Sequence, residues 1–307
     1  MKKRTYIGIG LAGLIALIIL AWQVEPLQGA PREEQVSTKP APPSPPKRIV
    51  SLAPSITEVL FALGLDSRIV GVTEQCNFPD RAMKKPKVGS FISGDVERII
   101  TMNPDLIVAT RDGNSERTIS LLEGLGFRIA TYQPATLEQV LEQILVLGRV
   151  TGRESQAHAI VEGCRGKMSL VKERVRGAPV LPVLFAYGRD PMILAGQRTF
   201  ADDMIRLSGG ANIATDSRIP YPQFSLEEVL ARGPEVIIDV SMGSDAAAQM
   251  AAEKDWSRWP EIPAVKAHRI YVLDQDLLAR PGPRLFEGLI MLAKSLHPEC
   301  FPEESRP

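Results

Sequence analysis

Two segments of the chain, 130 positions apart, share one pattern of hydrophobic and polar residues. Residues 95–109 read DVERIITMNPDLIVA, and residues 225–239 read SLEEVLARGPEVIID. In each segment a helix-capping residue, Asp95 or Ser225, opens a short amphipathic stretch that ends at a proline. The branched apolar run after each proline lacks polar alternation, which is typical of a strand buried on both faces of a parallel sheet. The repeat therefore predicts two similar α/β lobes.

The rest of the hydrophobic pattern predicts the other elements of these lobes. Strands are expected at 48–52, 69–72, 128–131, 179–187 and 270–273. Helices are expected at 56–63, 116–125, from 137 onward, and at 200–207, 246–254 and 284–296.

A proline-free stretch at 154–175 predicts one helix of about 22 residues, about 33 Å long. We therefore expect two Rossmann-like lobes with central sheets, at 47–150 and 178–300, joined by one long backbone helix within 151–177. Such a connector allows little hinge motion, because a helix does not absorb large dihedral changes as a loop does.

The first 46 residues follow a different pattern. Residues 1–4 read MKKR and precede an uncharged run that ends at Val24. This pattern predicts an exported protein with either a signal peptide or an N-terminal membrane anchor within 1–30, because the run is almost long enough to span a bilayer. No cysteine lies near the end of this run, so we do not expect a lipid anchor. Residues 31–46 form a proline-rich linker. A semi-stiff spacer of this kind favours a retained membrane anchor over a cleaved signal peptide, because it would tether the folded part to the membrane.

Composition excludes some classes of protein. The 36 basic and 36 acidic residues balance, so the sequence carries no electrostatic footprint for nucleic acid. Cys76, Cys164 and Cys300 are odd in number and far apart, so we expect three unpaired thiols.

The common catalytic motifs are missing. Gly166-Lys167 is followed by Met168 where a nucleotide-binding P-loop needs serine or threonine, and no nucleophile elbow of the form G-x-S-x-G occurs. The three histidines are isolated and show no metal-ligand spacing. We therefore expect no enzymatic activity, no cofactor and no metal. A membrane-anchored enzyme on the same two-lobe frame is the less favoured alternative.

Four segments carry a family resemblance: 48–58 (RIVSLAPSITE), 113–117 (GNSER), 217–223 (SRIPYPQ) and 280–284 (RPGPR). Over about 47–296 the chain resembles the helical-backbone periplasmic binding proteins of ABC importers for cobalamin and iron chelates, and most of all the cobalamin-binding component. The resemblance implies a periplasmic protein that captures a corrinoid between its lobes. It would deliver this ligand to an importer permease and, through it, to the ATPase. A ferric-siderophore or haem ligand is the alternative. Such a binder would have a tyrosine or histidine iron ligand or additional arginines in the cleft, and Tyr187 and Arg189 are candidates for these roles.

The resemblance also implies roles for individual residues. Glu97 and Glu227, at matched positions of the repeat, correspond to the glutamates that dock on permease arginines. In the cleft, Phe91 and Tyr221 correspond to aromatic positions of the cobalamin binder.

Two further positions correspond to polar groups at the corrin edge, and two depart from the family pattern. Asp276 and Arg280 are the polar positions. Gln75 and Ile193 stand where the cobalamin binder has aromatic rings, which leaves room for a smaller or differently shaped chelate. Gln75 and Tyr187 complete the expected ligand-binding set.

Overall fold

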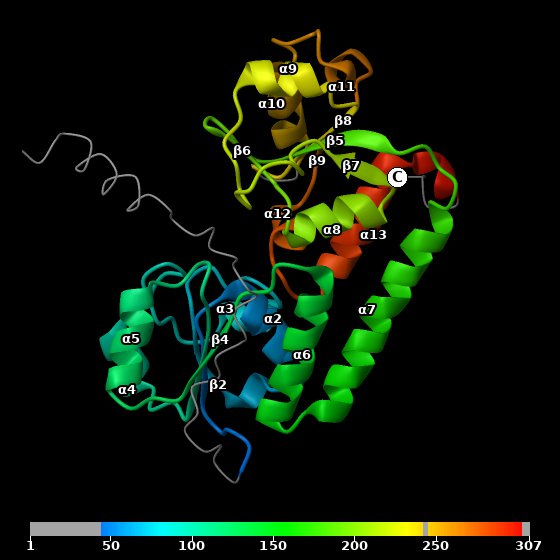
Figure 1. The fold of residues 1–307 in the computed structure, drawn as a ribbon. Coiled ribbons are helices and arrows are strands. Elements are labelled where there is room, and N and C mark those ends of the chain that lie inside the picture. Colours follow the sequence, from blue (N-terminus) through cyan, green and yellow to red (C-terminus); the bar gives the residue numbers. More distant parts are fainter. Residues whose placement is uncertain (1–43, 242–244, 303–307) are drawn as a thin grey trace, which may run out of the picture. The chain divides into compact units, whose positions relative to one another are not determined.

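The computed structural model describes residues 44–241 and 245–302 (Figure 1). The predicted signal peptide or anchor within 1–30 lies outside these residues. Within the described part of the chain, no helix combines the length and apolar character needed to cross a bilayer.

The N-terminal lobe contains a sheet of parallel strands in the order β2-β1-β3-β4. Its strands are β1 (Ile49–Ser51), β2 (Ile69–Val72), β3 (Leu106–Thr110) and β4 (Ile129–Tyr132). Its helices are α2 (Pro54–Ala62), α3 (Asp80–Met83), α4 (Val96–Thr101), α5 (Glu116–Gly124) and α6 (Leu137–Thr151), with a 3₁₀ turn at Asp66–Arg68. All four strands were predicted within one or two residues.

The C-terminal lobe repeats this architecture with two short additions. Strands β5 (Leu181–Arg189), β8 (Val236–Asp239) and β9 (Ile270–Val272) pair in parallel, as does β7 (Gly210–Asn212) with β5. Strand β6 (Met192–Leu194) pairs antiparallel with β5 at the sheet edge. The sequence pattern missed β6 and β7. Strand β7 reads GAN and has no apolar run, and β6 is a short edge strand that forms through its pairing with β5.

Six helices and one 3₁₀ turn of the described residues complete this lobe. They are α8 (Phe200–Leu207), α9 (Leu226–Arg232), α10 (Ala246–Trp256), α11 (Pro263–Lys266), α12 (Gln275–Leu278), α13 (Leu285–Leu296) and the turn Pro298–Cys300. The predicted helices at 200–207, 246–254 and 284–296 are confirmed with small differences at their ends.

The repeated segment folds as predicted in both lobes. Asp95 Oδ1 accepts a hydrogen bond from the Arg98 amide at 3.1 Å at the start of α4, and Ser225 forms a reciprocal capping box with Glu228 at the start of α9. Before each proline the chain turns through a left-handed residue, Asn103 (φ 45°) or Gly233 (φ 54°). Strands β3 and β8 follow, and every residue of both is buried.

One long helix, α7 (Glu154–Arg174), connects the lobes, as predicted. It packs along α6 and α13 (Figure 1). A single cluster of buried apolar side chains includes Leu147 of α6, Val161 and Val171 of α7, and Leu289 of α13. The connector is therefore part of a continuous core, which favours a stiff connection.

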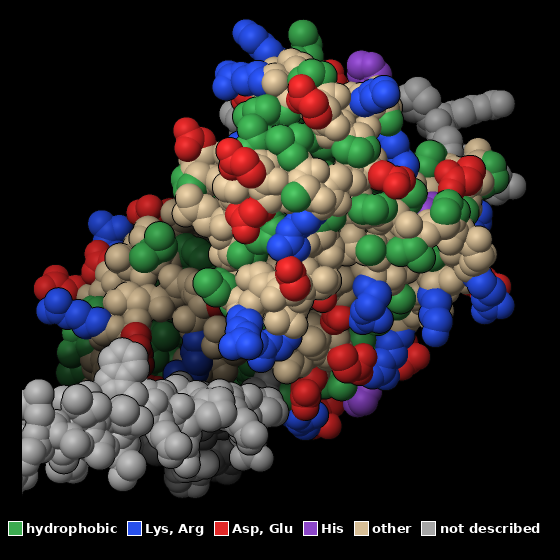
Figure 2. Space-filling view, turned by 45° about the horizontal axis from the view of Figure 1, so that its top comes forward, with side chains coloured by type: hydrophobic (Ala, Val, Ile, Leu, Met, Phe, Trp, Pro, Cys, Tyr) green, Lys and Arg blue, Asp and Glu red, His purple; other side chains and the backbone are tan. Residues whose placement is uncertain are grey.

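The three cysteines are unpaired, as predicted. Cys76 and Cys164 are buried, and the Cys76 sulfur contacts the hydroxyls of Thr57 and Thr73 at 3.1 Å. On the face drawn in Figure 2, acidic and basic side chains are interspersed, in keeping with the balanced composition.

Candidate ligand-binding site

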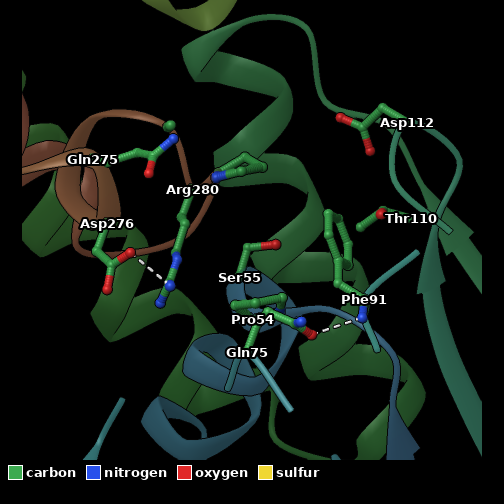
Figure 3. A pocket seen from close by; sticks show the side chains of 11 residues that line it. Pro54, Ser55, Gln75, Phe91, Thr110, Asp112, Gln275, Asp276 and Arg280 are labelled. Carbon is green, nitrogen blue, oxygen red and sulfur yellow. Dashed lines mark hydrogen bonds and ion pairs between the residues drawn. The ribbon is translucent and has the colours of Figure 1, made fainter. Parts of the chain in front are cut away.

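A cavity of about 410 Å³ opens between segments that belong to the two lobes. The N-terminal lobe contributes Pro54, Ser55, Gln75, Phe91, Thr110 and Asp112, and the C-terminal lobe contributes Gln275, Asp276, Ala279, Arg280 and Pro281. In Figure 3 the side chains of Gln275, Asp276 and Arg280 stand on one side, and those of Phe91, Thr110 and Asp112 stand on the other. A cavity with this mix of apolar surface and a few polar groups is suited to an organic ligand.

The position of these residues follows from the sheet topology. Ser55 follows β1, and Thr110 and Asp112 lie at the end of β3 and just after it. The carboxyl ends of parallel strands meet at one edge of a sheet, where open α/β folds bind their ligands.

Three polar side chains join the lobes beside the cavity. Arg280 Nη2 donates to Asp276 Oδ1 at 2.6 Å, and Arg280 Nη1 donates to Asn77 Oδ1 at 2.6 Å. Asn77 Nδ2 in turn donates to Asp276 Oδ2 at 2.8 Å. The guanidinium of Arg280 is therefore already engaged by partners from both lobes.

A buried carboxyl lies behind this group. Glu58 is 4% exposed, and its Oε1 lies 3.4 Å from Arg280 Nη1 and 3.3 Å from Arg284 Nη1. Burial raises the pKa of Glu58 to about 7, although the two arginines act in the opposite direction. Its Oε2 atom has no hydrogen-bond partner among the described residues. Arg284 also stacks over the Phe78 ring, with its guanidinium carbon 3.9 Å from the ring centroid. Arginines of the C-terminal lobe thus contact both Glu58 and Phe78 of the N-terminal lobe and join the two lobes.

The loop that carries Phe91 is held by side chains from its own lobe. The Phe91 amide donates to Gln75 Oε1 at 2.7 Å, and Asn114 Nδ2 donates to the Phe91 carbonyl at 2.5 Å. A Cβ atom at Gly113 would lie only 1.9 Å from the Phe91 ring, so any other residue at position 113 would clash with this ring. The Phe91 backbone is thus held beside the cavity, and Gly113 leaves room for its ring there.

The structure separates the predicted ligand residues into two groups. Gln75, Phe91, Asp276 and Arg280 line the cavity, whereas Tyr187 and Tyr221 are not among its lining residues. These tyrosines pack edge to face, with ring centroids 5.5 Å apart. Tyr221 is 45% exposed, and both its partial burial and the Asp112 carboxylate raise its pKa. Tyr221 therefore lies within electrostatic range of the cavity wall.

Tyr187 and Arg189 occupy enclosed positions in the C-terminal lobe. Burial raises the pKa of Tyr187 well above 10, and its hydroxyl has no hydrogen-bond partner among the described residues. Arg189 pairs with Asp255 at 2.8 Å and with the buried Asp239 at 3.4 Å. The charge of Arg189, which had left an anionic iron chelate as a possible ligand, is therefore already neutralised within the protein.

Sequence reasoning missed several lining residues, among them Thr110, Asp112 and Gln275. A signal existed for Thr110 and Asp112, because polar residues directly after a buried parallel strand mark the binding edge of the sheet. No group of three or more histidine, cysteine, aspartate or glutamate side chains that could hold a metal ion occurs in the part of the chain that the structure describes.

Comparison with known proteins now assigns the fold to a family. The model of a family described as periplasmic binding protein matches residues 49–277. The chain belongs to this family. The two lobes joined by a backbone helix are the arrangement expected from the resemblance of the sequence.

Relatives of this chain include proteins named for vitamin B12 and one whose name states no ligand. The vitamin B12-binding protein of Vibrio cholerae is 31% identical over 250 residues, which cover 81% of this chain and 88% of that protein. An uncharacterized ABC transporter substrate-binding lipoprotein of Bacillus subtilis is 32% identical over 99% of this chain and 100% of its own length.

Solved structures with a similar fold carry the names of binding proteins for different ligands. The structure of the V. cholerae vitamin B12-binding protein matches with a TM-score of 0.74 and 30% identity, covering 83% of this chain and 98% of that one. A periplasmic haem-binding protein from Roseiflexus matches with a TM-score of 0.72 and 27% identity, covering 83% and 99%. This periplasmic binding protein is thus of the ABC importer class, and similarity of fold does not decide its substrate.

The two glutamates of the repeat lie at equivalent places in this periplasmic binding protein. Glu97 and Glu227 are exposed in the first turns of α4 and α9, one residue after the start of each helix. A carboxylate there is favoured by the helix dipole, and it is also free to meet a partner.

Proposed function

We propose that this protein captures a corrinoid, with cobalamin as the type ligand, in the cavity between its lobes and delivers it to an ABC importer permease. The observation that carries the proposal is the composition of the cavity wall: an aromatic face at Phe91, uncharged polar groups at Gln75, Gln275 and Ser55, and an arginine already engaged by Asp276. A large flat macrocycle gains most from apolar contact and needs few hydrogen bonds for orientation. The similarity to vitamin B12-binding proteins supports the same ligand.

A haem or ferric-siderophore ligand is the second candidate, because haem-binding structures match the fold nearly as well. Two observations weigh against it. Arg189 is paired within its own lobe and so is poorly placed to neutralise an anionic chelate. Tyr187, the candidate iron ligand, is not among the residues that line the cavity, and burial raises its pKa and so keeps the phenol protonated.

Three further roles belong to the proposal. Glu97 and Glu227 would dock on permease arginines, since paired carboxylates suit bidentate guanidinium contacts. The N-terminal segment would direct export and, if retained, anchor the protein through the proline-rich linker. The protein would act by binding and release, without turnover of the ligand.

The test is spectroscopic, because each candidate ligand is coloured. The purified protein is titrated with cyanocobalamin, haemin and a ferric hydroxamate, and bound ligand is separated by gel filtration. Stoichiometric retention of cyanocobalamin, recovered chemically unchanged, is expected. Retention of haemin or the ferric chelate without cyanocobalamin would overturn the corrinoid assignment.

A further inference from the structure

Among the described residues that line the cavity, Asp112 is the charged group that lacks an oppositely charged partner. The lining contains the carboxylates of Asp112 and Asp276 and the guanidinium of Arg280. Arg280 is paired with Asp276 and also lies 3.4 Å from Glu58. Among the described residues no lysine or arginine pairs with Asp112 or acts on its pKa, which its surroundings raise by desolvation. In the part of the chain that the structure describes, the cavity lining thus presents a carboxyl group without a cationic partner and no unengaged cation.

A threonine hydroxyl with unfilled hydrogen-bonding capacity lies beside this carboxyl group. Thr110 is 3% exposed, and its Oγ1 atom makes no hydrogen bond that meets strict geometric limits among the described residues. The hydroxyl is nevertheless close enough to Asp112 to act against the rise of that carboxyl group's pKa. Both residues belong to the same wall of the cavity (Figure 3). A buried polar atom without a partner is costly, so a ligand atom that satisfies it contributes to affinity.

We propose that Asp112 and Thr110 form a carboxamide subsite that selects amide-bearing ligands over ligands with carboxylates at the same position. An amide N–H₂ donates to the Asp112 carboxylate, and the Thr110 hydroxyl exchanges a hydrogen bond with the amide oxygen or nitrogen. A ligand carboxylate meets Asp112 as a like charge with no cation between them. This inference rests on the proposed corrinoid function, because corrinoids carry carboxamide side chains whereas haem carries carboxylates.

The size of the discrimination follows from charge and desolvation. Like charges placed opposite one another in a partly desolvated site repel strongly. A binding site built to hydrogen-bond one group also rejects an analogue that leaves its polar atoms unpaired. We expect Asp112 to contribute roughly a tenfold preference for the amide over the acid.

The experiment uses a matched pair of ligands with one ring system: dicyanocobinamide, whose side chains are amides, and dicyanocobyrinic acid, whose side chains are carboxylates. Affinities for the full-length protein are measured by calorimetry for the wild type, Asp112→Asn and Thr110→Val. Glu123→Gln, which removes an exposed carboxylate of the same lobe outside the cavity, is the matched control.

Asp112→Asn is expected to reduce the amide-over-acid affinity ratio about tenfold, mainly by tighter binding of the acid. Thr110→Val is expected to weaken binding of the amide several-fold, and Glu123→Gln to leave the ratio unchanged. An unchanged ratio in Asp112→Asn, with the amide corrinoid still bound, overturns the subsite while the corrinoid function stands. If the wild type binds neither corrinoid but retains haemin, the proposed function itself is wrong, and the subsite is rejected with it.

Discussion

The buried Glu58 carboxyl makes the stability of this protein depend on pH, and Glu58→Gln tests that dependence. Burial raises its pKa from 4.5 to about 7. Between these values the folded protein keeps a proton that the unfolded chain releases. The contribution of Glu58 to the free energy of unfolding therefore decreases as pH rises through this window, and it is lowest above pH 7.

The magnitude follows from the two pKa values. Their difference, 7 minus 4.5, multiplied by about 1.36 kcal/mol for each unit of pH, gives about 3 kcal/mol. Glutamine has nearly the same shape and stays uncharged at every pH. The free energy of unfolding of Glu58→Gln, minus that of the wild type, should therefore increase by about 3 kcal/mol between pH 4 and pH 8. Other carboxyl groups titrate in both proteins and cancel in this difference.

Urea unfolding followed by circular dichroism at several pH values measures this difference. Glu123→Gln, at an exposed site on α5, controls for the loss of one carboxylate and should show no such trend. A difference that stays flat, or that shrinks as pH rises, would refute the reasoning. It would show that Arg280 and Arg284 outweigh burial and hold Glu58 charged in the folded protein.

Three other predictions concern binding and delivery. Replacing Phe91 and Tyr221 together by alanine should weaken corrinoid binding by about 1–3 kcal/mol through lost apolar contact; calorimetry that finds unchanged affinity would remove both from the site. Small-angle scattering with and without ligand should give nearly equal radii of gyration, because α7 is packed into a continuous core, and a change of several ångströms would count against a stiff connector. Glu97→Lys with Glu227→Lys should leave ligand affinity near that of the wild type but sharply reduce uptake into vesicles with a reconstituted permease. In the proposed docking each lysine would face a permease arginine; normal uptake by the folded double variant would disprove that docking.

Local patterning was sufficient for most of the architecture. The caps at Asp95 and Ser225, the stops at Pro104 and Pro234 and the buried strands after them depend on neighbours within a few residues, so periodicity revealed them. The long helix α7 was equally readable, because no proline interrupts it. Strands β6 and β7 escaped, because they form only through pairing with β5.

The cavity depended on contacts that no local pattern contains. The resemblance placed Phe91, Gln75, Asp276 and Arg280 at a binding site, and the fold brings these four to one cavity. It did not indicate that Arg280 would be engaged by Asn77 across 203 positions and Glu58 across 222. Whether a charged side chain is paired or free depends on which distant segment the fold places beside it. For the same reason the unpaired carboxylate of Asp112 became visible only once the charges around the cavity could be matched with their partners.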